Sequence, residues 1–428
     1  DTEFKINLGV VLIIKNLSTY LENNNYLEIT DTLSHESDVD VTMRISDPLI
    51  QKLNYRLNYE GILGNYEEKG TVDVNGIEDD IFKFTFPFAH LIADRPTITI
   101  TDIVYDGQEY SFAKIIQAPF NIYLGKGSGT ADDPYILNCT QHYLTFALSE
   151  TLFGGNDRYW QLGADIDISG QSAYVINTFN GHFDGNGFSI IGLEIEIDAI
   201  SFTQDTTYGW VHENRGTIEN LTFKNVTINA PVWHEGAWVF VGTVAGINRG
   251  EGVIRNVDIE NANISINRNM ARIGGIVGVN QGTISDCTVG GHSGDNHVTM
   301  FGNGDMGAVC GENTGTISNC VIMATLNHWP SVNNRSIGGV VGYSPSGTIS
   351  GCKLLLTKIA ITGTDANICP NIGSVVGHVT SRTVLEDNIP LVTYDVDALS
   401  EAQKIHYGRG SQYGYMEPVS YTHLRAHE

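Results

Sequence analysis

The chain of 428 residues is short of positive charge and of long apolar runs. It has 24 lysines and arginines against 49 acids, which gives a formal charge of −25. This charge, with no basic run, argues against a nucleic-acid partner, because phosphate would be repelled. The same repulsion argues against docking on anionic lipid. No apolar stretch reaches the ~18 residues that a spanning helix needs, so we expect no membrane insertion within this chain.

Motifs for catalysis and metal binding are also lacking. The chain has no HExxH, Walker, GxSxG or nucleotide-binding pattern. No cysteine and histidine cluster has the spacing of a zinc site. We therefore expect no cofactor and no metal.

Proline is scarce at 11 residues, whereas glycine is abundant at 47. Disordered linkers are usually rich in both, so this composition is typical of an ordered chain that turns often. Two sequence frames recur in the second half. The first contains two apolar-glycine pairs followed by Asn-x-Gly, and the second reads Gly-Thr-Ile-x-Asn with an apolar residue after it. The closing glycines of the first frame are spaced 31 to 35 residues apart, at Gly246, Gly278, Gly311, Gly342 and Gly377.

A unit of about 32 residues cannot bury an apolar face alone, but its stacked copies build a continuous core. The segments between turns have the length of strands and lack helical periodicity. The pattern therefore predicts an all-β fold with a parallel β-helix. Its hand should be right-handed, as strand crossovers prefer.

The asparagines of the two frames should stack as the coils do. Asparagine accepts left-handed backbone angles, and its amide can hydrogen-bond to the copies above and below. Exposed turn residues without such bonds are the alternative. We expect two structural ladders, one of Asn214, Asn248, Asn280 and Asn313, and one of Asn220, Asn256, Asp286 and Asn319.

These frames resemble the GLUG-motif repeats of bacterial cell-surface, adhesin-like proteins. The resemblance covers about residues 205–380, and it extends to roughly 125–390 with entry segments such as Gly127–Leu137 and Tyr159–Gly170. It implies the architecture of a surface protein and no particular activity. An extracellular or cell-surface location follows as an expectation.

Residues 1–122 lack the repeat. They alternate polar and apolar residues in strand-length runs such as Asp38–Ile45 and Thr97–Val104, with Asn75-Gly76 and Asp106-Gly107 as turn signals. We predict a separate antiparallel β-sandwich there, of the immunoglobulin-like kind.

The capped β-helix is predicted over residues 123–395. Within it, Thr140–Leu152 should form a short helix that covers the open end of the first coil. A C-terminal extension follows over 396–418. Residues 419–428 resemble a translated sequencing adapter of the kind seen on metagenomic sequences, so we expect the native chain to differ there.

Six cysteines would suggest disulfides in a secreted protein. Four of them, however, stand where other coils carry core aliphatic residues: Cys287, Cys310, Cys320 and Cys352. We predict that these four are buried free thiols that act as small hydrophobes. Cys139 and Cys369 lie outside these columns, and their state is left open.

Three loops interrupt the repeat, at Ala230–Trp238, Gly291–His297 and Asn327–Pro330. Insertions at one register map to one edge of a solenoid, and exposed aromatics there could stack on sugars or anchor a protein. The alternative is that each tryptophan folds back over its own coil. The ligand-binding residues predicted on this edge are Trp233, His234, Trp238, His292, His297, His328 and Trp329.

The main functional hypothesis is an adhesin-like binding module, secreted or attached to the surface. Its partner would be a glycan or a protein of a host or neighbouring cell, and the chain should be a monomer. One alternative is a spacer for a domain beyond residue 418. Another is a polysaccharide lyase or glycosidase with paired acids on one strand face. The candidate pairs are Asp165 with Asp167, Glu194 with Glu196, and Asp258 with Glu260.

Overall fold

The protein is described by a computed structural model. The described residues are 27–34, 38–45, 50–61, 64–74, 81–87, 97–105, 107–119, 127–153, 158–171, 176–197, 204–230, 237–291, 297–330, 335–363, 368, 370–399 and 413–416. The chain divides into two compact units. The first comprises Asp1–Ser128 with Asp133–Ser149, and the second Gly129–Asp132 with Glu150–Glu428.

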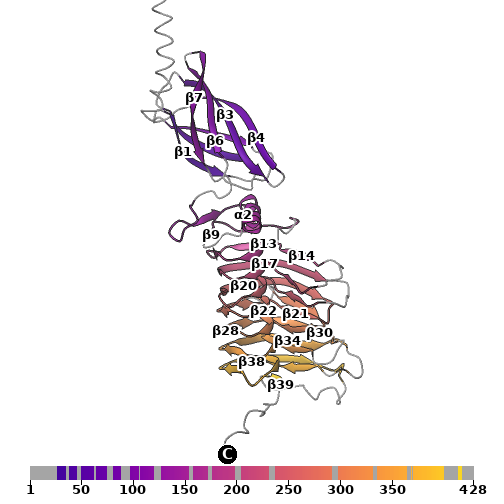
Figure 1. Cartoon of the computed structure of the whole chain (residues 1–428). Helices are drawn as coiled ribbons and strands as arrows, with labels where there is room; N and C mark the ends of the chain where they lie inside the picture. The colour runs from indigo at the N-terminus through magenta and orange to yellow at the C-terminus, as the bar shows by residue number, and fades with distance from the viewer. Residues whose placement is uncertain are drawn as a thin grey trace, which may run out of the picture. The chain divides into compact units, whose positions relative to one another are not determined.

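The first unit contains two antiparallel sheets (Figure 1). One is formed by β1 (Leu27–Ser34), β2 (Asp38–Ile45) and β5 (Ile81–Pro87). The other is formed by β4 (Gly64–Asp73), β3 (Ile50–Gly61), β6 (Thr97–Tyr105) and β7 (Gln108–Pro119). Apolar residues of both sheets are fully buried, among them Met43, Leu53 and Ile103. The predicted antiparallel β-sandwich is confirmed.

A short strand and a helix follow, β8 (Tyr135–Leu137) and α2 (Thr140–Phe153). The helix predicted over Thr140–Leu152 is thus confirmed, whereas its role as a cover stays a prediction. Phe146 and Ala147 are buried. Near the end of the helix, the buried Glu150 carboxylate accepts a hydrogen bond of 3.2 Å from the Trp160 indole.

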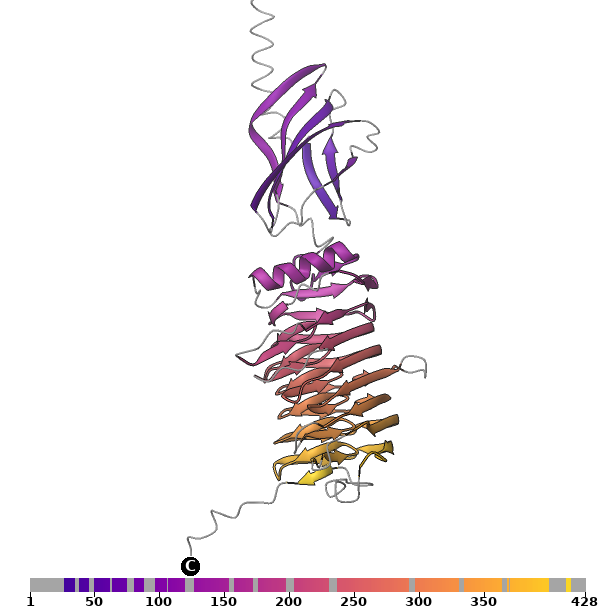
Figure 2. The ribbon, with the colours of Figure 1, turned by 90° about the vertical axis from the view of Figure 1, so that its right-hand side faces the viewer.

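The second unit is a β-helix whose strands pair in parallel from coil to coil (Figure 2). Its large sheet contains β9 (Tyr159–Leu162), β10 (Ile166–Asp167), β12 (His182–Asp184), β13 (Ser189–Ile191), β14 (Glu194–Glu196), β17 (Thr217–Ala230), β20 (Val253–Ile266), β23 (Thr283–Ser285), β24 (Thr288–Val289), β25 (Val298–Gly302), β28 (Thr316–Ser318), β29 (Val321–Ile322), β30 (Ala324–His328), β33 (Gly347–Ser350), β34 (Lys353–Ile361), β37 (Thr383–Glu386) and β38 (Ile389–Asp395).

Two smaller sheets complete each coil. The eight-stranded sheet contains β11 (Ile176–Phe179), β16 (Val211–Asn214), β19 (Ala245–Asn248), β22 (Val277–Asn280), β27 (Cys310–Asn313), β32 (Val341–Ser344), β36 (Val376–Val379) and β39 (Tyr413–Met416). The six-stranded sheet contains β15 (Thr206–Tyr208), β18 (Val239–Val241), β21 (Ala271–Gly274), β26 (Asp305–Gly307), β31 (Ser336–Gly338) and β35 (Asn371–Gly373).

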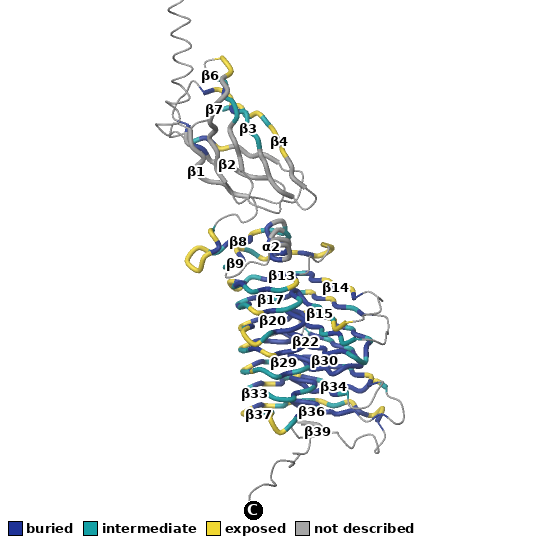
Figure 3. Tube along the Cα trace, viewed as in Figure 1, coloured by how far each residue is buried: buried dark blue, intermediate teal, exposed yellow. Residues whose placement is uncertain are grey.

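The repeat frames set the register between coils. Ile254 pairs with Ile284, Ile284 with Ile317, and Ile317 with Ile349, and all four are fully buried. Buried positions run through the inside of the coils, and many exposed ones lie at the turns (Figure 3). The predicted parallel β-helix is therefore confirmed. Beyond residue 395, β39 pairs with β36, whereas residues 419–428 lie outside the described part.

The cysteine columns belong to this core. Four free thiols are buried, those of Cys287, Cys310, Cys320 and Cys352. The prediction that they replace core aliphatic residues is confirmed. Burial raises the pKa of the Cys310 thiol well above its usual value. Cys139 is half-buried, and Cys369 lies outside the described residues.

The closing glycines of the first frame allow two sheets to approach closely. A Cβ atom on Gly311 of β27 would lie 2.4 Å from the backbone nitrogen of Ile273 in β21. On Gly278 of β22 it would lie 2.5 Å from that of Val241 in β18. Any side chain there would push the eight-stranded and six-stranded sheets apart, which is why glycine recurs at this position.

Candidate functional site

A buried amide ladder joins four coils along the eight-stranded sheet. The Asn214 side-chain amide donates to the side-chain oxygen of Asn248 at 2.8 Å. The Asn248 amide donates to Asn280, and Asn280 to Asn313, each at 2.9 Å. All four residues are completely buried. Ser344 takes the next position, where its hydroxyl donates to the Asn313 backbone carbonyl at 3.3 Å.

The second set of turn residues adopts left-handed backbone angles, with φ between 51° and 56°. Here the Asn256 amide donates to Asn220 at 2.8 Å, and Asn220 donates to Asp184 at 2.9 Å. Asn319 donates separately to Asp286 at 3.2 Å. These turns expose their polar side chains more than the first ladder does.

A third asparagine pair was missed by the sequence analysis. Asn225 and Asn261 are also left-handed, at φ 56° and 50°. The Asn261 amide donates to the Asn225 side-chain oxygen at 2.6 Å. The signal was an asparagine before a small apolar residue at equivalent positions of two successive coils.

The three predicted loops do not gather on one edge. Those at Ala230–Trp238 and Asn327–Pro330 both lie between the large and six-stranded sheets. The loop at Gly291–His297 instead lies within the large sheet, between β24 and β25. Both of these strands pair with the single strand β20. The insertion therefore interrupts a strand at the level of Asn261, rather than following it.

This placement separates His297 from Trp238, His328 and Trp329. Trp233, His234 and His292 lie outside the described residues. The half-buried His297 ring makes a hydrogen bond of 2.6 Å through Nε2 to the Thr325 hydroxyl.

His328 is part of the core. It is completely buried at the end of β30, and its Nε2 lies 2.7 Å from the Gly304 carbonyl oxygen. Burial lowers its pKa to about 4, so the ring is neutral at pH 7. An interior histidine cannot contact a ligand from solvent, which corrects the prediction for this residue.

Trp329, one residue further, projects outward and is 54% exposed. Its backbone is fixed, because its amide donates to the Gly302 carbonyl oxygen at 2.9 Å. Gly363 of a neighbouring coil lies beside the indole, where an added Cβ atom would be 3.4 Å from the indole nitrogen.

Trp238 is held by what we call the Arg–Trp cluster: Trp238, Arg272, Asp305, Glu312 and Arg335. The Arg272 and Arg335 guanidinium groups lie 4.0 and 4.8 Å from the Trp238 ring centroid. Cation–π contacts of this kind hold an indole in place. The alternative in which a tryptophan folds back over the coils thus describes Trp238. The Trp329 side chain, in contrast, is exposed to solvent.

The charges of the Arg–Trp cluster compensate one another. Asp305 is 3% exposed and forms ion pairs with Arg272 and, at 3.6 Å, with Arg335. Glu312 contacts Arg272 at 2.7 Å. Burial lowers the pKa of both arginines. The two anions nevertheless balance the charge of the two cations.

The sequence contained an unused signal for this cluster. Phe240, Arg272 and Asp305 occupy one register of the six-stranded sheet, directly before the first frame. Aligning the repeats would place the arginine over the aspartate.

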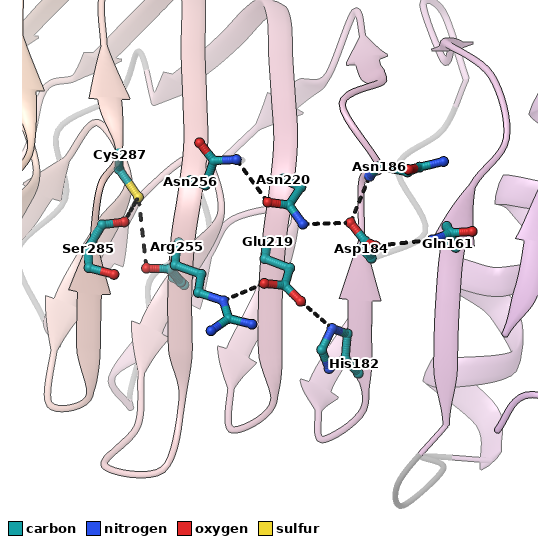
Figure 4. A network of polar contacts seen from close by, with 11 residues as sticks. Gln161, His182, Asp184, Asn186, Glu219, Asn220, Arg255, Asn256, Ser285 and Cys287 are labelled. Carbon is teal, nitrogen blue, oxygen red and sulfur yellow. Dashed lines mark hydrogen bonds and ion pairs between the residues drawn. The ribbon is translucent and has the colours of Figure 1, made fainter. Parts of the chain in front are cut away.

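A polar network lies on the large sheet, near the first coils (Figure 4). Glu219 is paired with His182 at 2.5 Å and with Arg255. Asp184 accepts hydrogen bonds from the Asn220 and Gln161 side chains, at 2.9 and 3.1 Å. The enzyme hypothesis requires acids beside a base. This network contains both, so it is the candidate active site under that hypothesis.

Its electrostatics are those of a structural network. Burial raises the pKa of Asp184, but hydrogen bonds led by that from Asn220 outweigh it and hold the pKa below the usual range. A general acid in glycoside hydrolysis needs a raised pKa. Both carboxylates are already engaged by donors from neighbouring coils.

The acid pairs predicted for an enzyme alternate with buried residues. Glu194 and Glu196 are exposed and flank the buried Ile195. The same alternation holds for Asp165 with Asp167 around Ile166, and for Asp258 with Glu260 around Ile259. This is the outward polar half of a strand whose other half forms the core.

Two further properties of the described residues bear on function. No group of three or more histidine, cysteine, aspartate or glutamate side chains among them could hold a metal ion. Within the same residues, no helix is long and apolar enough to cross a membrane.

The chain is similar to two curated proteins over part of its length. A Gly-rich membrane protein of Evansella cellulosilytica is 30% identical over 157 residues, which are 34% of this chain and 16% of that protein. Halomucin of Haloquadratum walsbyi is 28% identical over 173 residues, 40% of this chain and 2% of that protein. The chain therefore spans less than a fifth of either relative. No family model matches it, and no solved structure matches it.

Proposed function

We propose that this chain is a segment of a secreted or surface-attached, adhesin-like protein. Its β-helix acts as a rigid scaffold that presents the edge around Trp329 to a glycan or protein partner. The repeat frames, which resemble GLUG-motif repeats, support this proposal. So do the two relatives, of which one is called a membrane protein and the other halomucin.

Rigidity is supported by bonding between the coils. The Asn214–Asn313 ladder joins four consecutive coils through buried amides. A buried amide that loses its partner costs about 1–3 kcal/mol, so slippage between these coils is disfavoured. A scaffold of this kind can hold a side chain at a fixed distance from an attachment point.

The observation that carries the proposal is the exposure of Trp329. Of the tryptophans in the described part of the chain, Trp160 and Trp210 are buried and Trp238 is in contact with two arginines. Trp329 alone among them is mostly exposed. An exposed indole on a fixed backbone can stack on a sugar ring or enter a pocket of a partner.

The test is binding of the full chain to a glycan array and to immobilised cell-surface protein. Trp329→Ala should weaken binding at least tenfold, which corresponds to about 1.4 kcal/mol. Leu391→Ala is the matched control, since Leu391 is also apolar and 62% exposed. Equal binding by the wild type and Trp329→Ala would contradict the proposal. New reducing ends released from a glycan would favour the enzyme instead.

A further inference from the structure

A recessed surface lies on the large sheet. Its lining residues do not include Trp329. Its cavity has a volume of about 360 Å³. Binding pockets for small molecules typically measure ~300–1,000 Å³, so this one is of a size for a single sugar unit. Its polar lining consists of Asn225, Thr227, Asn261, Asn263, His297 and Thr299.

The register of three coils brings these side chains together. Thr227 pairs with Asn263, and Asn263 pairs with Thr299, on adjacent parallel strands. Asn225 and Asn261 border them at the left-handed turn. Neighbouring strands lie ~4.8 Å apart, which is close to the width of a pyranose ring.

The lining can both donate and accept hydrogen bonds. The bond between Asn261 and Asn225 uses one amide hydrogen and one oxygen. The Asn225 nitrogen and the Asn261 oxygen are outside that bond, and Asn263 and Thr299 add an amide and a hydroxyl. Sugar hydroxyls are also donors and acceptors at once, so they match such a surface.

Charge selects among possible ligands. Among the described residues, those that line the cavity include no acid, lysine or arginine. A metal cation would find no carboxylate ligand among them. An anion would meet no cation among them and would be repelled by a chain of net charge −25.

We propose that this cavity binds a neutral sugar unit of a glycan through the amides of Asn225, Asn261 and Asn263 and the hydroxyls of Thr227 and Thr299. This proposal rests on the proposed binding function and specifies its ligand class. The cavity does not include Trp329. The two proposals can therefore fail separately.

The experiment is calorimetric titration of the full chain with neutral oligosaccharides of xylose, glucose and mannose, and with an oligogalacturonate as the anionic comparison. Asn261→Gly removes the amide while a left-handed φ remains favourable. Asn263→Ala removes a second amide at an exposed strand position. Each variant should weaken binding of a neutral oligosaccharide at least tenfold.

The control is Asn229→Ala, because Asn229 lies on the same strand as Thr227 and outside the cavity. It should bind as the wild type does. The proposal is overturned if no neutral oligosaccharide binds, if the oligogalacturonate binds as tightly, or if Asn261→Gly and Asn263→Ala change nothing. Loss in these two variants with normal binding by Trp329→Ala would support the cavity and contradict the Trp329 edge.

Discussion

A residue's chemistry in this protein depends on its position within a coil, as His297 and His328 show. Both were predicted as ligand residues, because both lie beside interruptions of the repeat. His328 is the last residue of β30 and pairs with Gly302, so its ring enters the core and reaches the Gly304 carbonyl. The sequence could not reveal this, because one residue decides whether a side chain points inward or outward.

The buried ring makes stability depend on pH. The pKa of His328 falls from 6.5 to about 4 on folding, so below pH 6.5 the unfolded chain binds a proton that the folded chain does not. This contribution to stability is complete above pH 6.5 and is lost as the pH falls toward 4. The loss from this group between pH 7 and pH 4 is about 3 kcal/mol.

Denaturant unfolding at both pH values measures the effect. In His328→Leu the decrease in the free energy of unfolding between pH 7 and pH 4 should be smaller by that amount. An unchanged pH dependence in His328→Leu would contradict the burial of this ring.

At the scale of elements, stacked strands share one core column. Ile284 lies between Ile254 and Ile317, and it is fully buried. Ile284→Asp would place a carboxylate between apolar side chains without a partner, at a cost of several kcal/mol. We expect loss of cooperative thermal unfolding, measured by circular dichroism. Ser285→Asp, one residue on and facing outward, should melt within a few degrees of the wild type. A normal melt of Ile284→Asp would contradict the β-helix.

Much of this architecture was predictable because it is periodic. The spacing of the glycines gave the coil length, and substitution of aliphatic residues by Cys287 and Cys320 showed which face is inside. The Arg–Trp cluster was not predictable in the same way. Its Arg272–Asp305 pair lies within one sheet, but the contact of Arg272 with Glu312 joins two sheets, and that distance depends on how each coil bends. The loop at Gly291–His297 was misplaced because the large sheet has its own internal turn.

At the scale of the whole molecule, the net charge of −25 dominates the electrostatic contribution to stability. Like charges repel across a folded chain and destabilise it, whereas exposed ion pairs such as Lys52–Asp73 contribute little. Raising the salt from 0.01 M to 0.15 M shortens the Debye length from ~30 Å to ~8 Å. We expect the melting temperature to rise over this range. A fall would mean that attractive surface pairs outweigh the net repulsion.

The coil-to-coil direction of the backbone hydrogen bonds decides how the β-helix responds to mechanical tension. Force applied along the stack loads these bonds directly, and a terminal coil is held on one side only. When such a coil of 31 to 35 residues unfolds, the stack becomes ~4.8 Å shorter. The released residues span roughly 110 Å when extended. A β-helix that unfolds coil by coil therefore lengthens in large steps under tension and dissipates the load.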